Sequence, residues 1–499
     1  MRKSKRIFAA LSTMTVALSS VVLPSITQQS TVQSNAAQPT GGVPYTISAN
    51  NGLKNVMYYG DWSIWLGQGN FYPDAISADY LTHLNLAFLD FDADGNLMLC
   101  DASAVFGAPL FNGEDATQNA SEYTKNTLNW QAWTGAIKSG SEVIGKIGIN
   151  DGSVNAGIYP ALNELRRQYP NVRVGVSVGG WSKCEQFTGV ASDPSKRAAM
   201  VHNLEILLQF LDMDFIDIDW EYPGSRRAPD YKDNANDEGT PSAVANDGEY
   251  FVQLLEDLKA MENALGAKTG KFYELSAALP STTLGFMKGA QAFLPDSVLQ
   301  DAYGSNWNKI PTYSKRNTYD IIDEPVSTEG NPDISLINAT DEEWQDAAEE
   351  YLHRMFNALD IGNLMTYDMR GAFDDVSGHQ SPLYSHPIAD FDNTDIINGD
   401  NQAKSRNFST DDLVQFLLGN DYNSVGDPLP YTLKTAVYSK KIMLGICIYT
   451  RGWEDVASTP GYKNDTYPGL FQQAKRAYGA NGDEVGAQPA AIPADGDGG

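Results

Sequence analysis

The sequence predicts an α/β protein built as a TIM (β/α)8 barrel. Seven short apolar segments typical of β-strands follow one another along the chain, with helical segments between most of them. The strand predicted within residues 211–224 is apolar on one face and acidic on the other. Such a strand does not fit between two apolar layers, but it fits a barrel with helices outside and polar side chains at its mouth. A chain of 499 residues suits a barrel of about 250 residues enlarged by insertions.

The acidic face of this strand carries Asp217, Asp219 and Glu221 at every second position. Side chains at i, i+2 and i+4 of a strand share one face, with about 6.5 Å between successive ones. Three carboxylates at this spacing do not all ionise at low cost, so we expect a shared proton and pKa values that are driven apart. An enzyme obtains a protonated acid at neutral pH in this way. We therefore interpret the segment as a catalytic strand.

Two other interpretations of this strand are a solvated acidic face and a metal-binding loop. A solvated face seldom alternates so strictly with large apolar residues, which here are Ile216, Ile218 and Trp220. By the same alternation Trp220 is expected to face the helices. No Asp-x-Asp-x-Asp-Gly pattern of a calcium loop follows this strand, and the five histidines of the chain are scattered without a His-Glu-x-x-His pattern. We predict no metal site and no cofactor.

The other strands are predicted from short apolar runs bounded by turn residues. They lie at residues 56–59, 83–90, 172–178, 274–279, 361–367 and 442–449. Apolar residues at helical spacing predict helices at 154–169 and 247–265, and two more helices begin at cap signals. Asp193 precedes a proline at the first helical position, and Thr340 stands three residues before Glu343, as in a capping box.

Residues 1–37 are predicted to be a secretory signal, because a basic segment precedes an apolar core and then small residues. Serine and threonine within the apolar core argue against an uncleaved membrane anchor. We therefore expect a secreted protein that has no membrane contact after removal of the signal. Residues 38–55 are predicted to be an N-terminal extension, and 91–150 and 281–338 to be insertions in the barrel.

The formal net charge of −28 would repel nucleic acid and anionic membranes, and it suits a neutral or cationic ligand. We therefore predict no nucleic-acid partner. The three cysteines (Cys100, Cys184 and Cys447) form at most one disulfide, so no disulfide framework is expected. Neither charge nor composition indicates an oligomeric state.

Four motifs at the ends of predicted strands resemble those of one family. The acidic strand reads Asp-x-x-Asp-x-Asp-x-Glu over 214–221, and the third predicted strand ends in Ser-x-Gly-Gly-Trp over 177–181. Met-x-Tyr-Asp stands at 365–368 and Tyr-x-Arg-Gly-Trp at 449–453. In these motifs the chain resembles glycoside hydrolase family 18, the chitinases and their relatives, over about residues 56–453.

The resemblance implies hydrolysis of β-1,4 N-acetylglucosamine linkages with retained configuration and with assistance from the substrate, which is an exception to the two-carboxylate scheme. Glu221 would be the general acid on the glycosidic oxygen. The nucleophile would be the acetamido carbonyl oxygen of the sugar, and Asp219 would accept a hydrogen bond from the acetamido N–H. Asp217 would share a proton with Asp219, and Tyr367 would donate a hydrogen bond to the acetamido oxygen.

The same motifs assign further residues to the substrate site. Tyr58 and Ser177, at the ends of neighbouring strands, are expected to donate hydrogen bonds to Asp217. Aromatic faces suit sugar rings, so Trp62, Trp181 and with them Trp65 are expected at subsites. The remaining members of the predicted substrate site are Gly180, Met365, Asp368 and Arg451.

Two features depart from the family pattern. The family usually has glycine after the first aspartate of the acidic motif, and here Phe215 stands there. By alternation Phe215 points into the barrel below Asp217, where it requires small neighbours. Residues 454–499 contain no recognisable eighth strand, whereas similar chitinases often carry a small α+β insertion here and then a last strand with a tryptophan. We therefore expect 454–499 to be the start of such an insertion, in a chain truncated before its last barrel strand.

Three functions are compatible with these motifs. The first is a secreted chitinase that acts on chitin or chitooligosaccharides, and the presence of Glu221 favours it. The second is a non-catalytic chitin-binding lectin on the same fold, a class that commonly lacks this glutamate. The third is an endo-β-N-acetylglucosaminidase acting on N-glycans, which the Tyr-x-Arg-Gly-Trp motif and the position of the insertion disfavour.

Overall fold

The structure is a computed structural model that describes most of the predicted barrel. The described residues are 53–64, 71–99, 158–229, 237–310, 332–371, 378–385, 408–450, 477–478 and 484–485. The predicted signal, Trp65, Arg451, and residues 100–150 and 311–331 of the two predicted insertions lie outside them.

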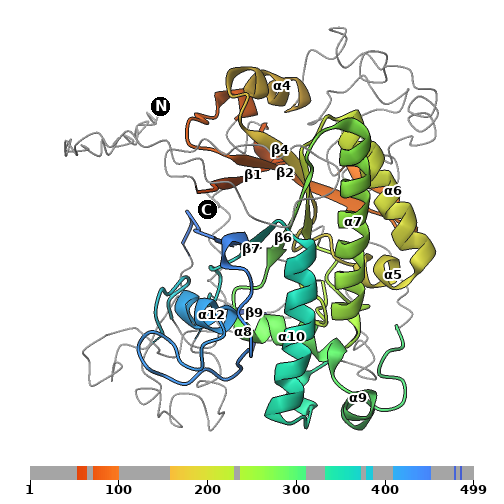
Figure 1. The fold of residues 1–499 in the computed structure, drawn as a ribbon, viewed down its shortest axis with the longest axis vertical. Helices are drawn as coiled ribbons and strands as arrows, with labels where there is room; N and C mark the ends of the chain where they lie inside the picture. The colour runs from red at the N-terminus through yellow and green to blue at the C-terminus, as the bar shows by residue number, and fades with distance from the viewer. Residues whose placement is uncertain are drawn as a thin grey trace, which may run out of the picture.

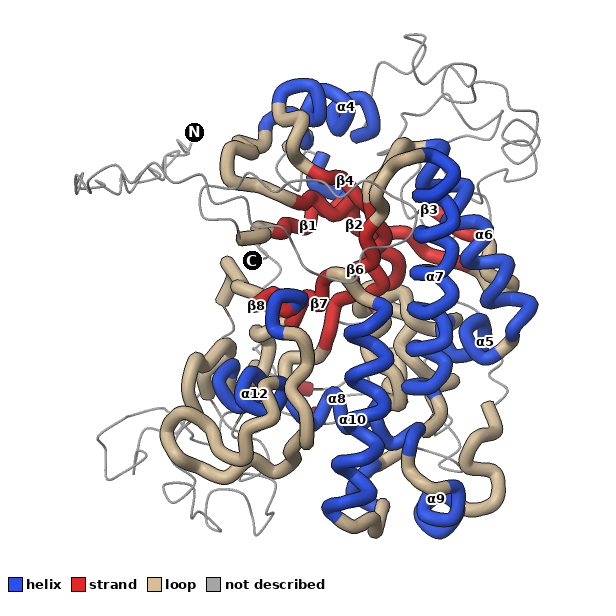
Figure 2. The backbone as a smooth tube through the Cα atoms, in the orientation of Figure 1, coloured by secondary structure: helices blue, strands red, loops and turns tan. Residues whose placement is uncertain are grey.

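Seven parallel strands form a curled sheet at the centre of the molecule (Figures 1 and 2). In sheet order these strands are β1 (Val56–Gly60), β2 (His83–Phe91), β4 (Arg173–Gly179), β5 (Phe215–Asp219), β6 (Glu274–Leu279), β7 (Ile361–Leu364) and β8 (Ile442–Leu444). Each strand pairs in parallel with the next one along the chain, as βαβ connections require. The α/β fold class and the seven predicted strands are therefore confirmed, and β1 and β8 are the edges of this sheet in the described part of the chain.

The last two predicted strands are too long. β7 ends at Leu364 and β8 at Leu444, whereas the apolar runs extend to 367 and 449. Beyond the ends of β7 and β8, isolated hydrogen bonds connect the two segments. The Gly445 amide donates to Leu364 O (2.8 Å), and the Thr366 hydroxyl donates to Gly445 O (2.7 Å). The motif residues that follow are therefore loop residues above the sheet.

The first part of the predicted insertion at 91–150 forms a hairpin, in which residues 92–95 form a turn, as their sequence predicts, and the short strand after it was not predicted. β3 (Leu97–Leu99) pairs antiparallel with the end of β2. In the turn, Asp92 Oδ1 accepts hydrogen bonds from the amides of Asp94 and Asn96, both at 2.9 Å. Gly95 adopts a φ of +81°, which glycine tolerates without strain.

Helices follow most strands and cover the sheet. The α-helices are α4 (Ile158–Gln168), α5 (Phe187–Ser192), α6 (Pro194–Phe210), α7 (Asp247–Thr269), α8 (Thr283–Ala290), α9 (Asp296–Tyr303), α10 (Asp341–Ala358) and α12 (Thr410–Leu417). The short 3-10 helices are η1 (Asp61–Ile64), η3 (Pro73–Ala75), η6 (Gln291–Phe293), η7 (Ile334–Leu336) and η9 (Ser439–Lys441). Figure 1 shows α6, α7 and α10 side by side along one side of the sheet. A separate ribbon consists of β9 (Ala477–Tyr478) and β10 (Glu484–Val485). None of the described helices is long and apolar enough to span a membrane.

Both predicted helix caps are present. The Asp193 carboxylate accepts hydrogen bonds from the amides of Ser195 (2.8 Å) and Lys196 (3.2 Å), with Pro194 at the first position of α6. Thr340 and Glu343 form the reciprocal capping box of α10. These caps begin the helices that precede β5 and β7, the strands that carry site residues.

The outer face of β5 packs against the helices, as the alternation predicts. Trp220, which follows the strand, is 1% exposed. Its ring stacks on Phe187 of α5 (4.9 Å between centroids) and meets Phe251 of α7 edge-on at 5.8 Å. Because one face of β5 is fixed in this way, its other face points into the curled sheet.

Phe215 occupies the inside of the sheet below Asp217 and has the small neighbour that it requires. Gly175 of β4 is its register partner, and a Cβ added at Gly175 would overlap the Phe215 ring. His83 of β2 packs against the same ring, with 5.4 Å between the centroids. The bulky residue at this position is therefore accommodated by a glycine on the adjacent strand.

A buried ionic cluster lies at the same level. Glu274 of β6 contacts Lys54 (2.9 Å), His83 (2.9 Å) and Arg173 (2.6 Å). Burial raises the pKa of Glu274, but the charges of Lys54, Arg173 and His83 outweigh it and hold this pKa well below its usual range. The cluster joins three strands at the end of the sheet opposite to the acidic row, where barrels keep residues that serve stability.

We predict that Gly175→Ala lowers the free energy of unfolding by about 1–3 kcal/mol, since the added methyl group displaces the Phe215 ring. The double variant Gly175→Ala/Phe215→Leu should recover part of the loss, and urea unfolding measures both. Gly189→Ala is the matched control, because nothing lies within 4 Å of a Cβ added there. Equal stabilities of the Gly175 and Gly189 variants would contradict the packing.

Candidate active site

The predicted site residues meet where the parallel strands end. Asp217 and Asp219 belong to β5, and Glu221 follows two residues beyond the strand. The register pairs Asp217 with Ser177 on β4 and with Ser276 on β6, while Asp219 pairs with Gly179. The peptide bond that joins Glu221 to Tyr222 is cis. Asp217 is therefore framed by strands on both sides, Asp219 is paired on the β4 side, and Glu221 lies just beyond the strand.

Asp217 is fully buried and accepts hydrogen bonds from four side chains. Tyr58 (3.0 Å) and Ser177 (2.8 Å) donate to Oδ2, as predicted. Ser276 and Asn363 (3.3 Å) donate to Oδ1. Burial raises the pKa of Asp217, and these four hydrogen bonds oppose the rise because they favour the charged form.

Ser276 and Asn363 were not predicted. Each is a polar residue inside a mostly apolar strand, and that is the signal that marks an inward position next to the acidic row. Such a polar residue is equally common on a solvent-facing strand, so the choice required the sheet order and the register.

Asp219 and Glu221 are hydrogen-bonded to each other through their side chains. A hydrogen bond between two carboxyl groups needs one proton. Burial raises the pKa of Asp219 well above its usual range, and the charges of Glu221 and Asp217 add to this. Burial likewise raises the pKa of Glu221 to about 7, against the hydrogen bond from Tyr222 and the charge of Arg227, which lower it. The pair therefore holds a proton near neutral pH.

One oxygen of this pair is free for a ligand. Asp219 is 4% exposed, and its Oδ1 is buried without a hydrogen-bond partner among the described residues. A buried carboxylate oxygen without a donor is costly, so it is a natural acceptor for an N–H or O–H group brought by a substrate.

The glycines after β4 let the next loop approach the acids. Gly179 and Gly180 have φ values of +104° and +91°, and a Cβ at Gly179 would overlap the Asp219 carbonyl oxygen. The Gly180 amide donates to that carbonyl oxygen at 2.7 Å. The Cys184 Sγ accepts a hydrogen bond from the Glu221 amide (3.2 Å). The sequence did not predict this contact. The loop thus fixes the backbone between the two acids, at the Asp219 carbonyl and the Glu221 amide.

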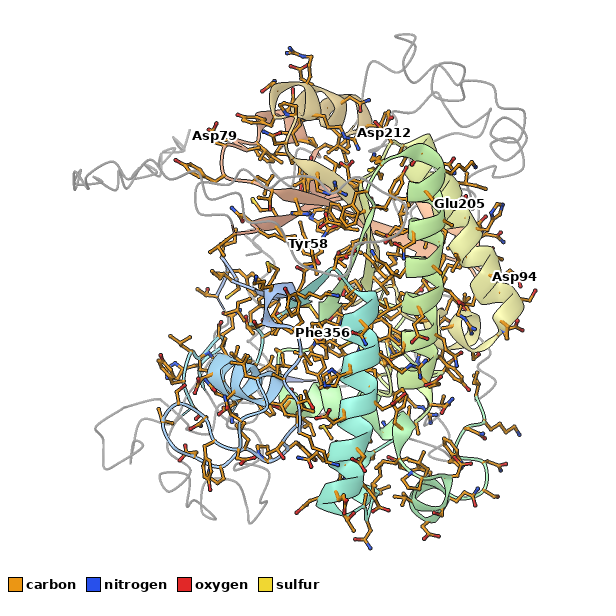
Figure 3. All side chains as sticks on the ribbon, viewed as in Figure 1. Tyr58, Asp79, Asp94, Glu205, Asp212 and Phe356 are labelled. Atoms are coloured by element: carbon orange, nitrogen blue, oxygen red, sulfur yellow. The ribbon has the colours of Figure 1, made fainter. Side chains whose placement is uncertain are left out.

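Three predicted substrate-binding aromatic residues are exposed at this end of the sheet. Tyr58, Trp62 and Trp181 are 38%, 47% and 40% exposed. Trp62 stacks on Phe88 (6.2 Å between centroids), and a Cβ added at Gly180 would meet the same Phe88 ring. Figure 3 shows Tyr58 near the middle of the molecule, away from labelled peripheral residues such as Asp94.

The Met-x-Tyr-Asp loop after β7 lies beside the acids. Tyr367 is half-buried, and burial and then the charges of Asp219 and Glu221 raise its pKa, which places its hydroxyl in their field. Asp368, with a φ of 53°, accepts hydrogen bonds from the Tyr449 hydroxyl and from Gln380 (3.2 Å). Met365, the first residue after β7, is held to β6 by its amide, which donates to Leu279 O at 2.9 Å. Arg451 lies outside the described residues, so its predicted role stays a prediction.

No group of three or more His, Cys, Asp or Glu side chains in the described part of the chain could hold a metal ion. Cys184 and Cys447 are free thiols.

Residues 54–305 and 327–486 match the family model described as glycosyl hydrolases family 18. The chain belongs to this family. Chitinase A of Pseudoalteromonas piscicida is 27% identical over 313 residues, which cover 61% of this chain and 28% of that protein. Chitinase A1 of Niallia circulans is 24% identical over 484 residues, 94% of this chain and 50% of that protein. This chain thus matches half or less of the length of these two relatives.

A solved structure shows the same fold. Chitinase ChiA74 from Bacillus thuringiensis superposes with a TM-score of 0.50 at 23% identity, covering 87% of this chain and 52% of that one. The family's neighbours are TIM barrels, and the curled parallel sheet with its helical layer belongs to that class.

We predict that Glu221→Gln changes how stability depends on pH. Glu221 has its pKa raised in the folded state from 4.5 to about 7, so its stabilising contribution is complete below pH 4.5 and is lost as the pH rises to about 7. The glutamine variant has no such loss. Its stability relative to wild type should therefore rise by on the order of 1–3 kcal/mol between pH 4 and pH 8.

Guanidinium unfolding at the two pH values measures this difference. Glu350→Gln makes the same chemical change on a surface carboxylate of α10 that is 58% exposed, and it should run parallel to wild type. A Glu221→Gln curve that also runs parallel to wild type would contradict the raised pKa.

Proposed function

We propose that the protein is a chitinase that hydrolyses β-1,4 N-acetylglucosamine linkages by substrate-assisted catalysis with retained configuration. Family membership and the chitinase relatives support this activity. The observation that carries the mechanism is the Asp219–Glu221 pair, which holds a proton near neutral pH beside a buried, unpartnered Asp219 oxygen. Glu221 can thus donate a proton, and Asp219 can accept a hydrogen bond from a substrate N–H group.

In the first step Glu221 donates its proton to the glycosidic oxygen as the bond to the anomeric carbon breaks. The acetamido carbonyl oxygen of the same sugar attacks that carbon and forms an oxazolinium ion. Asp219 accepts a hydrogen bond from the acetamido N–H at its unpartnered Oδ1. This bond orients the nucleophile and offsets the positive charge of the ion. Tyr367, in the field of both acids, donates to the acetamido oxygen.

In the second step Glu221, now a carboxylate, removes a proton from the water that attacks the anomeric carbon from the side the leaving group vacated. Asp217 shares a proton with Asp219 and takes up the negative charge when Asp219 turns to Glu221. Hydrogen bonds from Tyr58, Ser177, Ser276 and Asn363 favour this charged form, against the burial that raises the pKa of Asp217. Negative charge next to Asp219 favours the cationic intermediate. Two inversions at one carbon give retention.

The substrate side of the proposal is chitin or chitooligosaccharides. Trp62 and Trp181 offer exposed aromatic faces for the C–H faces of sugar rings. The strongly negative protein suits a neutral or partly deacetylated, cationic polymer. We also propose that residues 1–37 direct export, which amino-terminal sequencing of protein from the culture medium tests directly.

We predict that Glu221→Gln lowers kcat on a reporter chitooligosaccharide by about 10²–10⁴-fold with little change in KM, because the variant loses the general acid and keeps the binding surface. Glu350→Gln is the control and should retain full activity.

The first product detected by proton NMR should be the β-anomer. Wild-type protein that binds chitooligosaccharides without releasing a reporter would instead support the lectin, and release from a glycoprotein alone the endo-β-N-acetylglucosaminidase.

We predict a single alkaline limb in the pH profile of kcat/KM, near pH 7. Glu221 must be protonated to act as an acid, so the rate falls as the pH rises through its pKa of about 7. A neutral reporter substrate keeps other titrations out of the profile. A rate that stays constant from pH 5 to pH 9 would contradict the assignment.

A further inference from the structure

Arg227 lies in the loop that follows the acidic strand, and it holds Trp181 in two ways. Its guanidinium carbon lies 3.8 Å from the centroid of the Trp181 ring, so the guanidinium covers one face of the indole. Its Nη2 also donates a hydrogen bond to the Trp181 carbonyl oxygen. The same residue therefore restrains both the ring and the backbone of Trp181.

Arg227 is itself held by Asp237, which is 1% exposed. The guanidinium meets this carboxylate through both terminal nitrogens, with 2.9 Å from Nη2 to Oδ1 and a second bond from Nη1 to Oδ2. The Gly239 amide also donates to Asp237 (3.0 Å). A two-pronged bond of this kind fixes the plane of the guanidinium as well as its position.

Backbone hydrogen bonds from residues 238 and 240 hold the same two loops together. The Thr240 amide donates to the Arg227 carbonyl oxygen (2.9 Å), and the Glu238 amide donates to the Ser182 carbonyl oxygen (3.1 Å). The segment that carries Asp237 thus binds both the Arg227 loop and the loop that carries Trp181. Rotation of the guanidinium would break its bonds to Asp237 and to the Trp181 carbonyl oxygen together.

We propose, on the premise of the proposed function, that Arg227 held by Asp237 is a positioning residue that fixes the plane of Trp181 and leaves the opposite face of the indole to receive a sugar ring beside Glu221. Trp181 suits this task, because it is 40% exposed and its backbone N–H donates to the Glu221 carboxyl group. Arg227 then acts on the substrate through Trp181, without touching it.

The charge of Arg227 adds a second effect on Glu221. Among the residues that the structure describes, the ionisable groups that interact with Glu221 are Asp219 on β5, Tyr222 in the same loop, Cys184 after β4, Tyr367 after β7 and Arg227. Of these only Arg227 is a cation, and it lowers the pKa of Glu221 against the effect of burial. Loss of its charge should therefore raise this pKa.

Two variants, one single and one double, separate the two effects. Arg227→Lys keeps the charge but loses the planar fork. Arg227→Gln combined with Asp237→Asn removes both charges, keeps planar hydrogen-bonding groups and avoids an unpaired buried carboxylate. Arg167→Gln removes an arginine that is 72% exposed on α4 and serves as the charge control. Thermal unfolding confirms that each variant is folded.

The lysine variant should bind chitotetraose about 5-fold more weakly when both are compared in a Glu221→Gln background, since the indole loses its stacked support. Its alkaline limb in kcat/KM should stay in place. The double variant should move that limb to higher pH by about half a pH unit. The shift is small because a partly exposed charge acts through a high effective dielectric. The Arg167→Gln control should change neither quantity.

Two readouts do not depend on hydrolysis. Carbon-13 NMR titration of the Glu221 carboxyl group should show the same upward shift in the double variant, and acrylamide should quench Trp181 fluorescence more strongly in the lysine variant. If wild type neither binds nor cleaves chitooligosaccharides while these two shifts appear, the proposed function fails and the positioning by Arg227 stands. An unchanged titration together with unchanged quenching overturns the positioning role, whatever the activity.

Discussion

The central constraint in this structure is three carboxyl groups on one face of a buried strand. A buried charge must be paired, hydrogen-bonded or neutralised, and each acid meets this requirement differently. Asp217 receives four donors from neighbouring strands, so it can remain charged. Asp219 and Glu221, with fewer donors, share a hydrogen bond and have raised pKa values. The row therefore contains one acid whose charged form is favoured by four donors and a pair that holds a proton, and this difference is the basis of the proposed acid catalysis.

The two ends of the sheet use charge for opposite purposes. At the end away from the acidic row, Glu274 contacts Lys54, His83 and Arg173, and its pKa is low because each of these neighbours favours the charged form. At the acidic end the carboxyl groups neighbour one another, and their pKa values are high. Parallel strands place every strand's carboxyl end at the same edge, so catalytic groups from distant parts of the chain gather there while stabilising groups occupy the other edge.

Much of the fold was predictable because strand and helix periodicities are local. The seven strands, both helix caps and the outward orientation of Trp220 are present as expected. The ends of β7 and β8 were wrong, because apolar and aromatic motif residues there continue a strand-like pattern while the chain has already left the ladder. β3 was missed because three residues are too short a run to be distinguished from a loop. For the site, Tyr58 and Ser177 were predicted to contact Asp217 and do so.

The sequence by itself determined which residues carry the chemistry, because an alternating row of acids encodes a shared face without any knowledge of the rest of the chain. Only the tertiary structure decided how that row is divided. Ser276, Asn363, Cys184 and Arg227 come from separate segments, and each acts through a distance or a plane that exists only once the strands are in register. Register also resolved the place of Phe215, since Gly175 lies next to it on β4 although 40 residues separate them in the chain. Protonation depends on burial and on such neighbours, and these are properties of the assembled sheet.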